Sequence, residues 1–188
     1  SLSDLLVFGK RAGEHAARFA RERGAVNIDT STVEAAERVA LAPFERAAAG
    51  GEAEAPYKIQ YELQDLMQEN VGIVRNEVDM RKALEGIQAL KARAAKIAAG
   101  GNREYNPGWH TALDLANLLT CAEVIATSAL ERKESRGGHF REDFPDKDPN
   151  FASFNHVVRK GAGGRADLRR ETIPALRDDL KQVVEENK

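Results

Sequence analysis

The segment Leu115–Leu130 constrains the fold more than any other part of the chain. Its only charged residue is Glu123, and every other position is apolar or uncharged. A helix that is apolar on nearly every face belongs at the centre of a bundle, so Leu119 and Ile125 are expected in the core. Glu123 is expected either at a seam between helices or buried beside a partner, which is a structural role rather than a catalytic one.

Helical periodicity also dominates the first half of the chain. The first helix starts at the beginning of the sequence and is expected to end at Gly24, because glycine favours the backbone angles of a helix C-terminus. A second helix is expected to start at Ser31, whose spacing from Glu34 fits a capping box. It is expected to bend near Pro43 and to stop at Gly50.

Two further helices are expected beside the central one. Apolar residues recur at helical spacing over Tyr57–Glu69 and from about Glu77 to Ala99. These two helices and the central helix are expected to form the core. The fold class is therefore all-α, an antiparallel helical bundle, and residues 1–150 are expected to form the bundle domain.

The composition changes after Pro145. Phe151–Arg159 and Arg165–Ile173 flank the run Gly161–Gly164, and this pattern predicts a small C-terminal β-hairpin. A phosphate-binding loop is not favoured at the glycine run, because no strand-to-helix context surrounds it. A short charged helix is expected from about Ala175 to Glu186, so residues 151–188 form a hairpin and a short helix.

Composition narrows the class of protein. The formal charge of −2 gives no electrostatic reason to expect nucleic acid as a partner. A single cysteine, Cys121, excludes an internal disulfide, fits a reducing compartment and is expected to be a small buried side chain. Since no stretch approaches about 18 uninterrupted apolar residues, no direct membrane insertion is expected. The sequence opens inside a helical pattern without methionine, which indicates a fragment of a longer chain.

The segment Glu134–Pro145 is the strongest candidate for a functional site. It reads Glu-Ser-Arg-Gly-Gly-His-Phe-Arg-Glu-Asp-Phe-Pro, with two arginines, a histidine and three acids around a pair of glycines. A charge-dense loop at a helix end often contacts a partner, although a solvated loop with a glycine cap is the simpler interpretation. The four histidines of the chain lie far apart in the sequence and show no metal-ligand spacing.

This segment closely resembles the Glu-Ser-Arg-Gly-x-His-x-Arg-x-Asp-Phe-Pro pattern of succinate dehydrogenase and fumarate reductase flavoprotein subunits. Ser1–Gly13 and Met67–Arg75 resemble two other segments of that family, and the three occur in the family's order. L-aspartate oxidase shares the fold but usually lacks the Arg141–Phe144 run. The alternatives are the C-terminal domain of that enzyme and a non-enzymatic helical interaction module.

The resemblance implies that the chain is the C-terminal helical domain of such a subunit. The full subunit would use FAD to interconvert succinate and fumarate and would pass electrons to an iron–sulfur subunit, in the cytoplasm at the membrane face. The FAD-binding and capping domains would precede this chain and hold the catalytic residues. The fragment alone is expected neither to retain FAD nor to catalyse, and no catalytic or metal-binding residue is assigned to it.

The resemblance also implies two sets of contact residues. Ser1 and Leu2 match a pair whose backbone amides meet the flavin, which agrees with the affinity of free helix N-terminal amides for electron-rich groups. Arg136, His139 and Arg141 are expected to dock against the remaining domains or the iron–sulfur subunit, because guanidinium groups suit carboxylates and carbonyls at such contacts.

Overall fold

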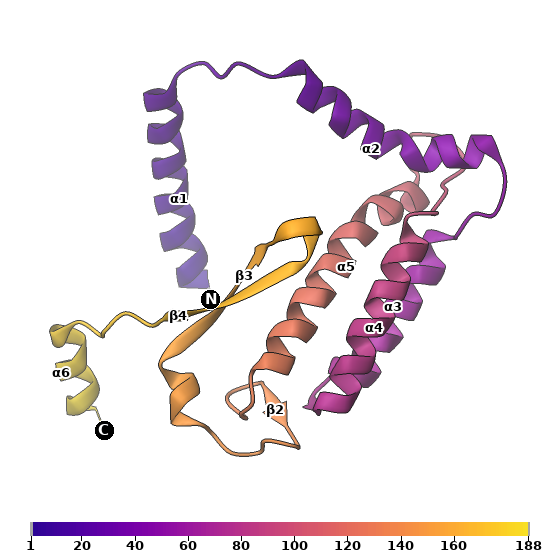
Figure 1. Cartoon of the computed structure of the whole chain (residues 1–188). Helices are drawn as coiled ribbons and strands as arrows, with labels where there is room; N and C mark the ends of the chain where they lie inside the picture. Colours follow the sequence, from indigo (N-terminus) through magenta and orange to yellow (C-terminus); the bar gives the residue numbers. More distant parts are fainter. Residues whose placement is uncertain (1, 188) are drawn as a thin grey trace. The chain divides into compact units, whose positions relative to one another are not determined.

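The computed structural model describes residues 2–187 and contains six α-helices and two short sheets within that range (Figure 1). The chain divides into two compact units, Ser1–Leu41 and Ala42–Lys188. The all-α class with a small C-terminal hairpin is confirmed. The expected domain boundary near residue 150 remains a prediction.

The first unit consists of α1 (Leu2–Arg23) and the first part of α2 (Thr30–Ala49). Helix α1 ends as expected, since Gly24 adopts a φ of +69° and its N–H donates to the carbonyl of Ala20 at 3.1 Å. The expected cap of α2 is wrong. Asp29 caps this helix, because its carboxylate accepts from the backbone N–H of Ser31 at 3.0 Å and takes the role assigned to the Ser31 hydroxyl.

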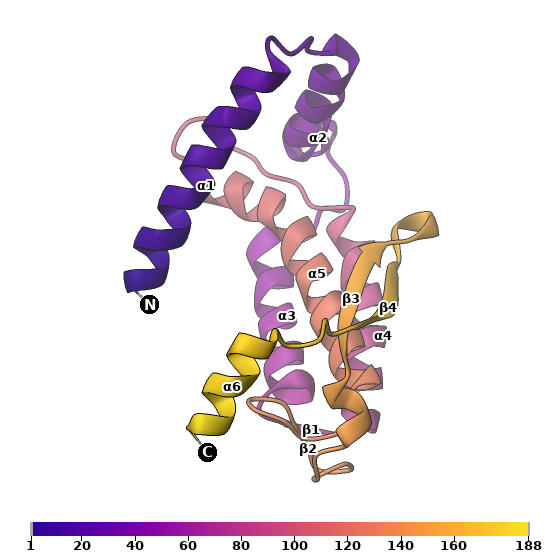
Figure 2. The ribbon, with the colours of Figure 1, turned by 90° about the vertical axis from the view of Figure 1, so that its left-hand side faces the viewer.

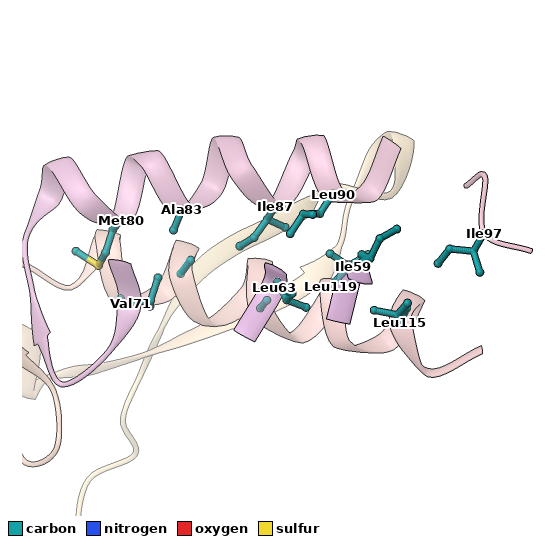
Figure 3. Packing of buried hydrophobic residues seen from close by; sticks show 13 residues of the cluster. Ile59, Leu63, Val71, Met80, Ala83, Ile87, Leu90, Ile97, Leu115 and Leu119 are labelled. Atoms are coloured by element: carbon teal, nitrogen blue, oxygen red, sulfur yellow. The ribbon is translucent and has the colours of Figure 1, made fainter. Parts of the chain in front are cut away.

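Three helices form the core of the second unit (Figures 1 and 2). They are α3 (Pro56–Val71), α4 (Glu77–Ala94) and α5 (Pro107–Glu131), and each packs against the other two. Figure 3 shows their apolar side chains meeting in one cluster. Its large, deeply buried side chains include Ile59, Met80, Ile87, Leu115 and Leu119. The predicted core of three helices is confirmed.

Glu123 lies in the seam between α4 and α5. Its carboxylate accepts from the Gln88 amide at 2.7 Å and from the Lys91 ammonium at 2.5 Å. The side chain is buried, so these partners compensate the loss of water around the charge. The structural pairing predicted for Glu123 is confirmed.

The rest of α5 is less enclosed than its sequence indicates. Ile125 is 50% exposed and Cys121 is exposed, so both predictions of burial were wrong. Helices α3 and α4 cover only one side of α5, and the apolar residues on its other side reach the surface of the described chain. By length and composition, α5 could cross a membrane. A core helix meets the same criterion, and six residues of α5 are buried in this unit.

Helix α4 ends at Ala94, earlier than the Ala99 predicted from its apolar spacing. A turn at Ala95 and Lys96 follows, and Ile97 then forms a parallel bridge with Glu54. Ile97 is buried in the core, which explains why it fits the apolar pattern although it is not helical. The helix was predicted too long because the apolar spacing reports that Ile97 is buried and not that it is helical.

The C-terminal hairpin pairs β3 (Phe154–Lys160) with β4 (Ala166–Thr172) in antiparallel register, with Val157 opposite Arg169. The glycine run forms its turn, where Gly163 has a φ of +66°. The hairpin is confirmed. The short helices η1 (Pro149–Ala152) and η2 (Ala162–Gly164) flank β3, and α6 (Asp178–Glu186) follows β4.

Candidate functional site

A two-residue parallel sheet joins the Glu134–Pro145 loop to the end of α3. Strand β1 (Val74–Arg75) pairs with β2 (Phe140–Arg141), and the N–H of Glu142 donates to the carbonyl of Arg75 at 2.9 Å (Figure 2). Gly72 ends α3 just before β1. Two of the segments that carry the family resemblance therefore meet in the fold, although their paired residues lie more than sixty positions apart in the sequence.

The carboxylate of Glu134 is the centre of the loop. It is fully buried and accepts from the guanidinium groups of Arg136 and Arg132, with shortest distances of 2.9 and 2.7 Å. It also accepts from the backbone N–H of Asp148 at 2.9 Å. The hydrogen bonds from Arg136, followed by those from Arg132, lower the pKa of Glu134 from 4.5 to about 2. Glu134 is thus held ionised, and the loop is not a solvated helix cap.

Arg141 is the second anchor, and its side chain is fully buried. Its guanidinium group donates to both carboxylate oxygens of Asp143, at 2.7 and 2.6 Å. Its Nη1 donates to the carbonyls of Ala129 and Leu130 at the end of α5. These carbonyls have no partner within the helix and lie at its negative end, so a buried cation is well placed there. Arg141 also holds the pKa of Asp143 below its usual value.

His139 connects β1 to the end of α5. Its Nδ1 lies 2.9 Å from Nη1 of Arg75, and its Nε2 lies 3.0 Å from the carbonyl of Arg132. A carbonyl only accepts, so Nε2 carries the proton and Nδ1 accepts from the guanidinium group. Burial and then the charge of Arg75 lower the pKa of His139, although the bond to the Arg132 carbonyl opposes them. The imidazole is therefore neutral near pH 7.

The expected docking residues differ in what they offer a partner. Arg136 keeps part of its side chain exposed while it pairs with Glu134, whereas Arg141 has no exposed surface and binds groups of its own chain. Docking by Arg136, His139 and Arg141 stays a prediction, and the geometry gives all three a role inside the loop. The sequence did not identify Arg75 as their neighbour, because only the β1–β2 pairing reveals it.

The expected flavin-contacting pair falls in the first unit. Ser1 lies outside the described residues, and Leu2 is the first residue of α1, with 76% of its surface exposed. Flavin contact by Ser1 and Leu2 stays a prediction.

Within residues 2–187, no three His, Cys, Asp or Glu side chains group closely enough to hold a metal ion. The histidines are not all dispersed, because His139 and His156 line one cavity.

Comparison with known proteins identifies the family. Residues 60–182 match the family model described as fumarate reductase flavoprotein C-term. The chain is 37% identical to the fumarate reductase flavoprotein subunit of Haemophilus influenzae over 149 residues, which cover 79% of this chain and 24% of that subunit.

Solved structures agree. Mycobacterium smegmatis Sdh1, solved in complex with UQ1, superposes with a TM-score of 0.89 and 40% identity, covering 100% of this chain and 31% of that one. The FrdA chain of Escherichia coli quinol fumarate reductase superposes with a TM-score of 0.77 and 28% identity, covering 94% of this chain and 31% of that one. This chain thus spans about a quarter to a third of the length of these relatives. It belongs to the family formed by the C-terminal domains of succinate dehydrogenase and fumarate reductase flavoprotein subunits.

Proposed function

We propose that this chain completes a flavoprotein subunit that interconverts succinate and fumarate with FAD and transfers electrons to an iron–sulfur subunit. The observation that carries this proposal is the match to Mycobacterium smegmatis Sdh1 along the whole of this chain. The FAD-binding and capping domains would precede α1, in the part of the subunit that this chain does not span. FAD would supply the hydride transfer and hold the electrons taken from succinate.

Helix α1 supports a role inside a larger subunit. No residue of α1 is buried within the described chain, and Leu2, Leu5, Leu6 and Phe8 are each at least 60% exposed. So many exposed large apolar side chains on one short segment are typical of a surface that a partner covers. The preceding domains of the same subunit are the proposed cover.

The start of α1 also fits an electron-rich ligand. The first amides of a helix have no partner within the helix, and the helix dipole makes this end positive. The backbone amides of Ser1 and Leu2 would therefore hold the flavin ring, while the side chain of Leu2 would contribute only apolar contact. The Glu134–Pro145 loop would help to dock the iron–sulfur subunit or the preceding domains through Arg136, which is more exposed than Arg141, the other arginine of the loop.

The proposed location is the cytoplasm, at the membrane face. Two solved relatives were determined with UQ1 or with menaquinol molecules, a quinone and a quinol respectively. The subunit would reach the membrane through its complex and would not insert into the bilayer itself.

The flavin contact can be tested in the full-length subunit with Leu2→Pro, which removes one amide hydrogen, and Leu2→Ala as the matched control that keeps it. The proline variant is expected to shift the flavin reduction potential or weaken FAD retention, and the alanine variant is expected to resemble the parent. Equal potential and retention in both variants would remove Leu2 from the flavin site.

The docking role has a separate test. In the full-length flavoprotein, Arg136→Ala is expected to reduce either the amount of iron–sulfur subunit that co-purifies or the amount of FAD that the flavoprotein retains. Circular dichroism on the 188-residue chain should show that the variant remains folded. Normal assembly and normal FAD content would leave Arg136 with only its structural bond to Glu134.

A further inference from the structure

A cavity of about 490 Å³ opens on the second unit between α5, strand β3 and the Arg75–His139 contact. Apolar residues of α5 form part of its wall. Its polar lining consists of Arg75, Ser128, Arg132, His139, Asn155 and His156. No acidic side chain lines it, so its polar surface consists of cations and neutral hydrogen-bonding groups.

Arg75 is the unusual member of this lining. Its Nε donates to the carbonyls of Val71 and Gly72, and its Nη1 donates to His139. All three acceptors are neutral, and no carboxylate of the described residues lies within 4.0 Å of its guanidinium group. By contrast, Arg132 and Arg141 each have an acidic partner nearby. A half-buried guanidinium group without a counter-charge favours binding of an anion.

His156 gives a second indication of a missing partner. Its Nε2 is buried and has no hydrogen-bond partner among the described residues, which is rare for a buried polar atom. The ring packs against Phe151 and Phe154, with centroids 6.0 and 5.4 Å away. Burial lowers the pKa of His156. The positive charges of Arg132 and Arg170, together with His139, lower this pKa further, whereas the negative charge of Glu131 raises it.

Two neutral groups complete the donor set. The side chains of Ser128 and Asn155 line the cavity and make no hydrogen bond to any described residue. A hydroxyl and an amide both donate to oxygen acceptors. The cavity therefore combines one uncompensated cation with free neutral donors, which balances a singly charged group better than a phosphate dianion.

We propose that this cavity binds a carboxylate, which pairs with the Nη1–Nη2 edge of Arg75 and accepts hydrogen bonds from Ser128 and Asn155. The carboxylate belongs either to a free small acid or to an Asp or Glu side chain in the part of the subunit that lies outside this chain. The proposal does not depend on flavin chemistry, so it can fail or succeed separately from the proposed function.

The test uses histidine side-chain resonances of the 188-residue chain, recorded by NMR while acetate or succinate is added at constant ionic strength. The His156 signal is expected to shift and to saturate, whereas the signals of His15 and His110, which do not line the cavity, should stay in place. Inorganic phosphate and chloride serve as competing probes. A His156 signal that does not saturate with acetate or succinate, or that responds equally well to phosphate, would overturn the carboxylate site.

Two variants test the assigned groups. Arg75→Gln is expected to weaken acetate binding about tenfold or more, because a charge-assisted hydrogen bond is lost. Arg81→Gln is the control, since it removes an exposed arginine that does not line the cavity. If Arg75→Gln disturbs the fold, Asn155→Asp replaces it as the test. Asn155 is exposed, and an aspartate there should repel the ligand and abolish the shift. Unchanged affinity in folded Arg75→Gln or in Asn155→Asp would refute the assignment.

The source of the carboxylate is resolved in the full-length subunit with isotope-labelled histidine. If a side chain of the preceding domains fills the cavity, added acetate shifts His156 in the 188-residue chain but not in the full-length protein. If the ligand is a free acid, both proteins respond. Either result supports the carboxylate assignment, and a full-length response without any response of the shorter chain contradicts it.

Discussion

At the scale of single residues, Glu134 organises the candidate site. Its buried carboxylate joins Arg132, Arg136 and the backbone of Asp148, so one side chain fixes both ends of the loop. The sequence pattern named Glu134 as part of a motif, but the pattern could not reveal that this carboxylate is buried. The same holds for Arg75 and His139, whose contact depends on a pairing across more than sixty residues.

Replacing Glu134 should destabilise the folded chain. We expect Glu134→Gln to lower the free energy of unfolding by about 3 kcal/mol, the lower end for a broken buried ion pair, because both arginines are partly exposed. Glu131→Gln is the matched control, since Glu131 pairs with Arg170 at the surface and should cost less than about 1 kcal/mol. Urea unfolding of the two variants measures the difference, and equal losses would contradict the central role of Glu134.

The same carboxylate predicts a pH dependence. The pKa of Glu134 falls from 4.5 to about 2 in the folded chain, so the stabilisation is complete above about pH 4.5 and is lost as the pH falls toward 2. The parent chain should therefore lose stability over this window more steeply than Glu134→Gln. Thermal unfolding at several pH values tests this, and parallel profiles for the two proteins would show that Glu134 is not held ionised.

At the scale of elements, the sequence predicted the helices whose apolar residues lie on one buried stripe. Helix α3 and the hairpin match their predicted positions closely, because Gly72 and the Gly161–Gly164 run end them clearly. The predicted end of α4 was wrong, because buried Ile97 continues the helical spacing of apolar residues although it lies beyond the helix and pairs with Glu54. The exposure of Cys121 was also missed, because the sequence does not say which side of an apolar helix its neighbours cover.

The two sides of α5 should respond differently to substitution. Leu119→Ala is expected to lower the free energy of unfolding by about 3 kcal/mol, because Leu119 is only 2% exposed and the change leaves a cavity. Ile125→Ala removes similar atoms from a half-exposed position and should cost about 1 kcal/mol or less. Chemical denaturation compares them, and equal costs would mean that α5 is enclosed on both sides.

At the scale of the whole molecule, the chain contains a core and exposed apolar surfaces. The second unit holds a buried cluster built from α3, α4 and α5. Helix α1 has no buried residue, and Leu118 and Ile125 of α5 reach the surface of the described chain. The chain also spans only about a third of its solved relatives. The proposed larger subunit, whose other domains would cover these surfaces, would account for both observations.

Because most of the proposed cofactor site belongs to other domains of the subunit, we expect the 188-residue chain alone to be colourless and not to oxidise succinate. The reason is physical: in the proposed arrangement α1 would offer only its first amides to the flavin, and the rest of the cofactor site would lie in the preceding domains. An absorbance spectrum after purification in the presence of FAD measures retention. A flavin band that survives gel filtration would contradict the prediction.

The central claim is that this chain completes a succinate- and fumarate-converting flavoprotein. Its most direct test is the absorbance of bound flavin in the purified full-length subunit, followed while succinate and then fumarate are added. The account predicts that succinate bleaches the flavin band and that fumarate restores it. A full-length subunit that binds no flavin, or whose flavin band responds to neither acid, would contradict the claim.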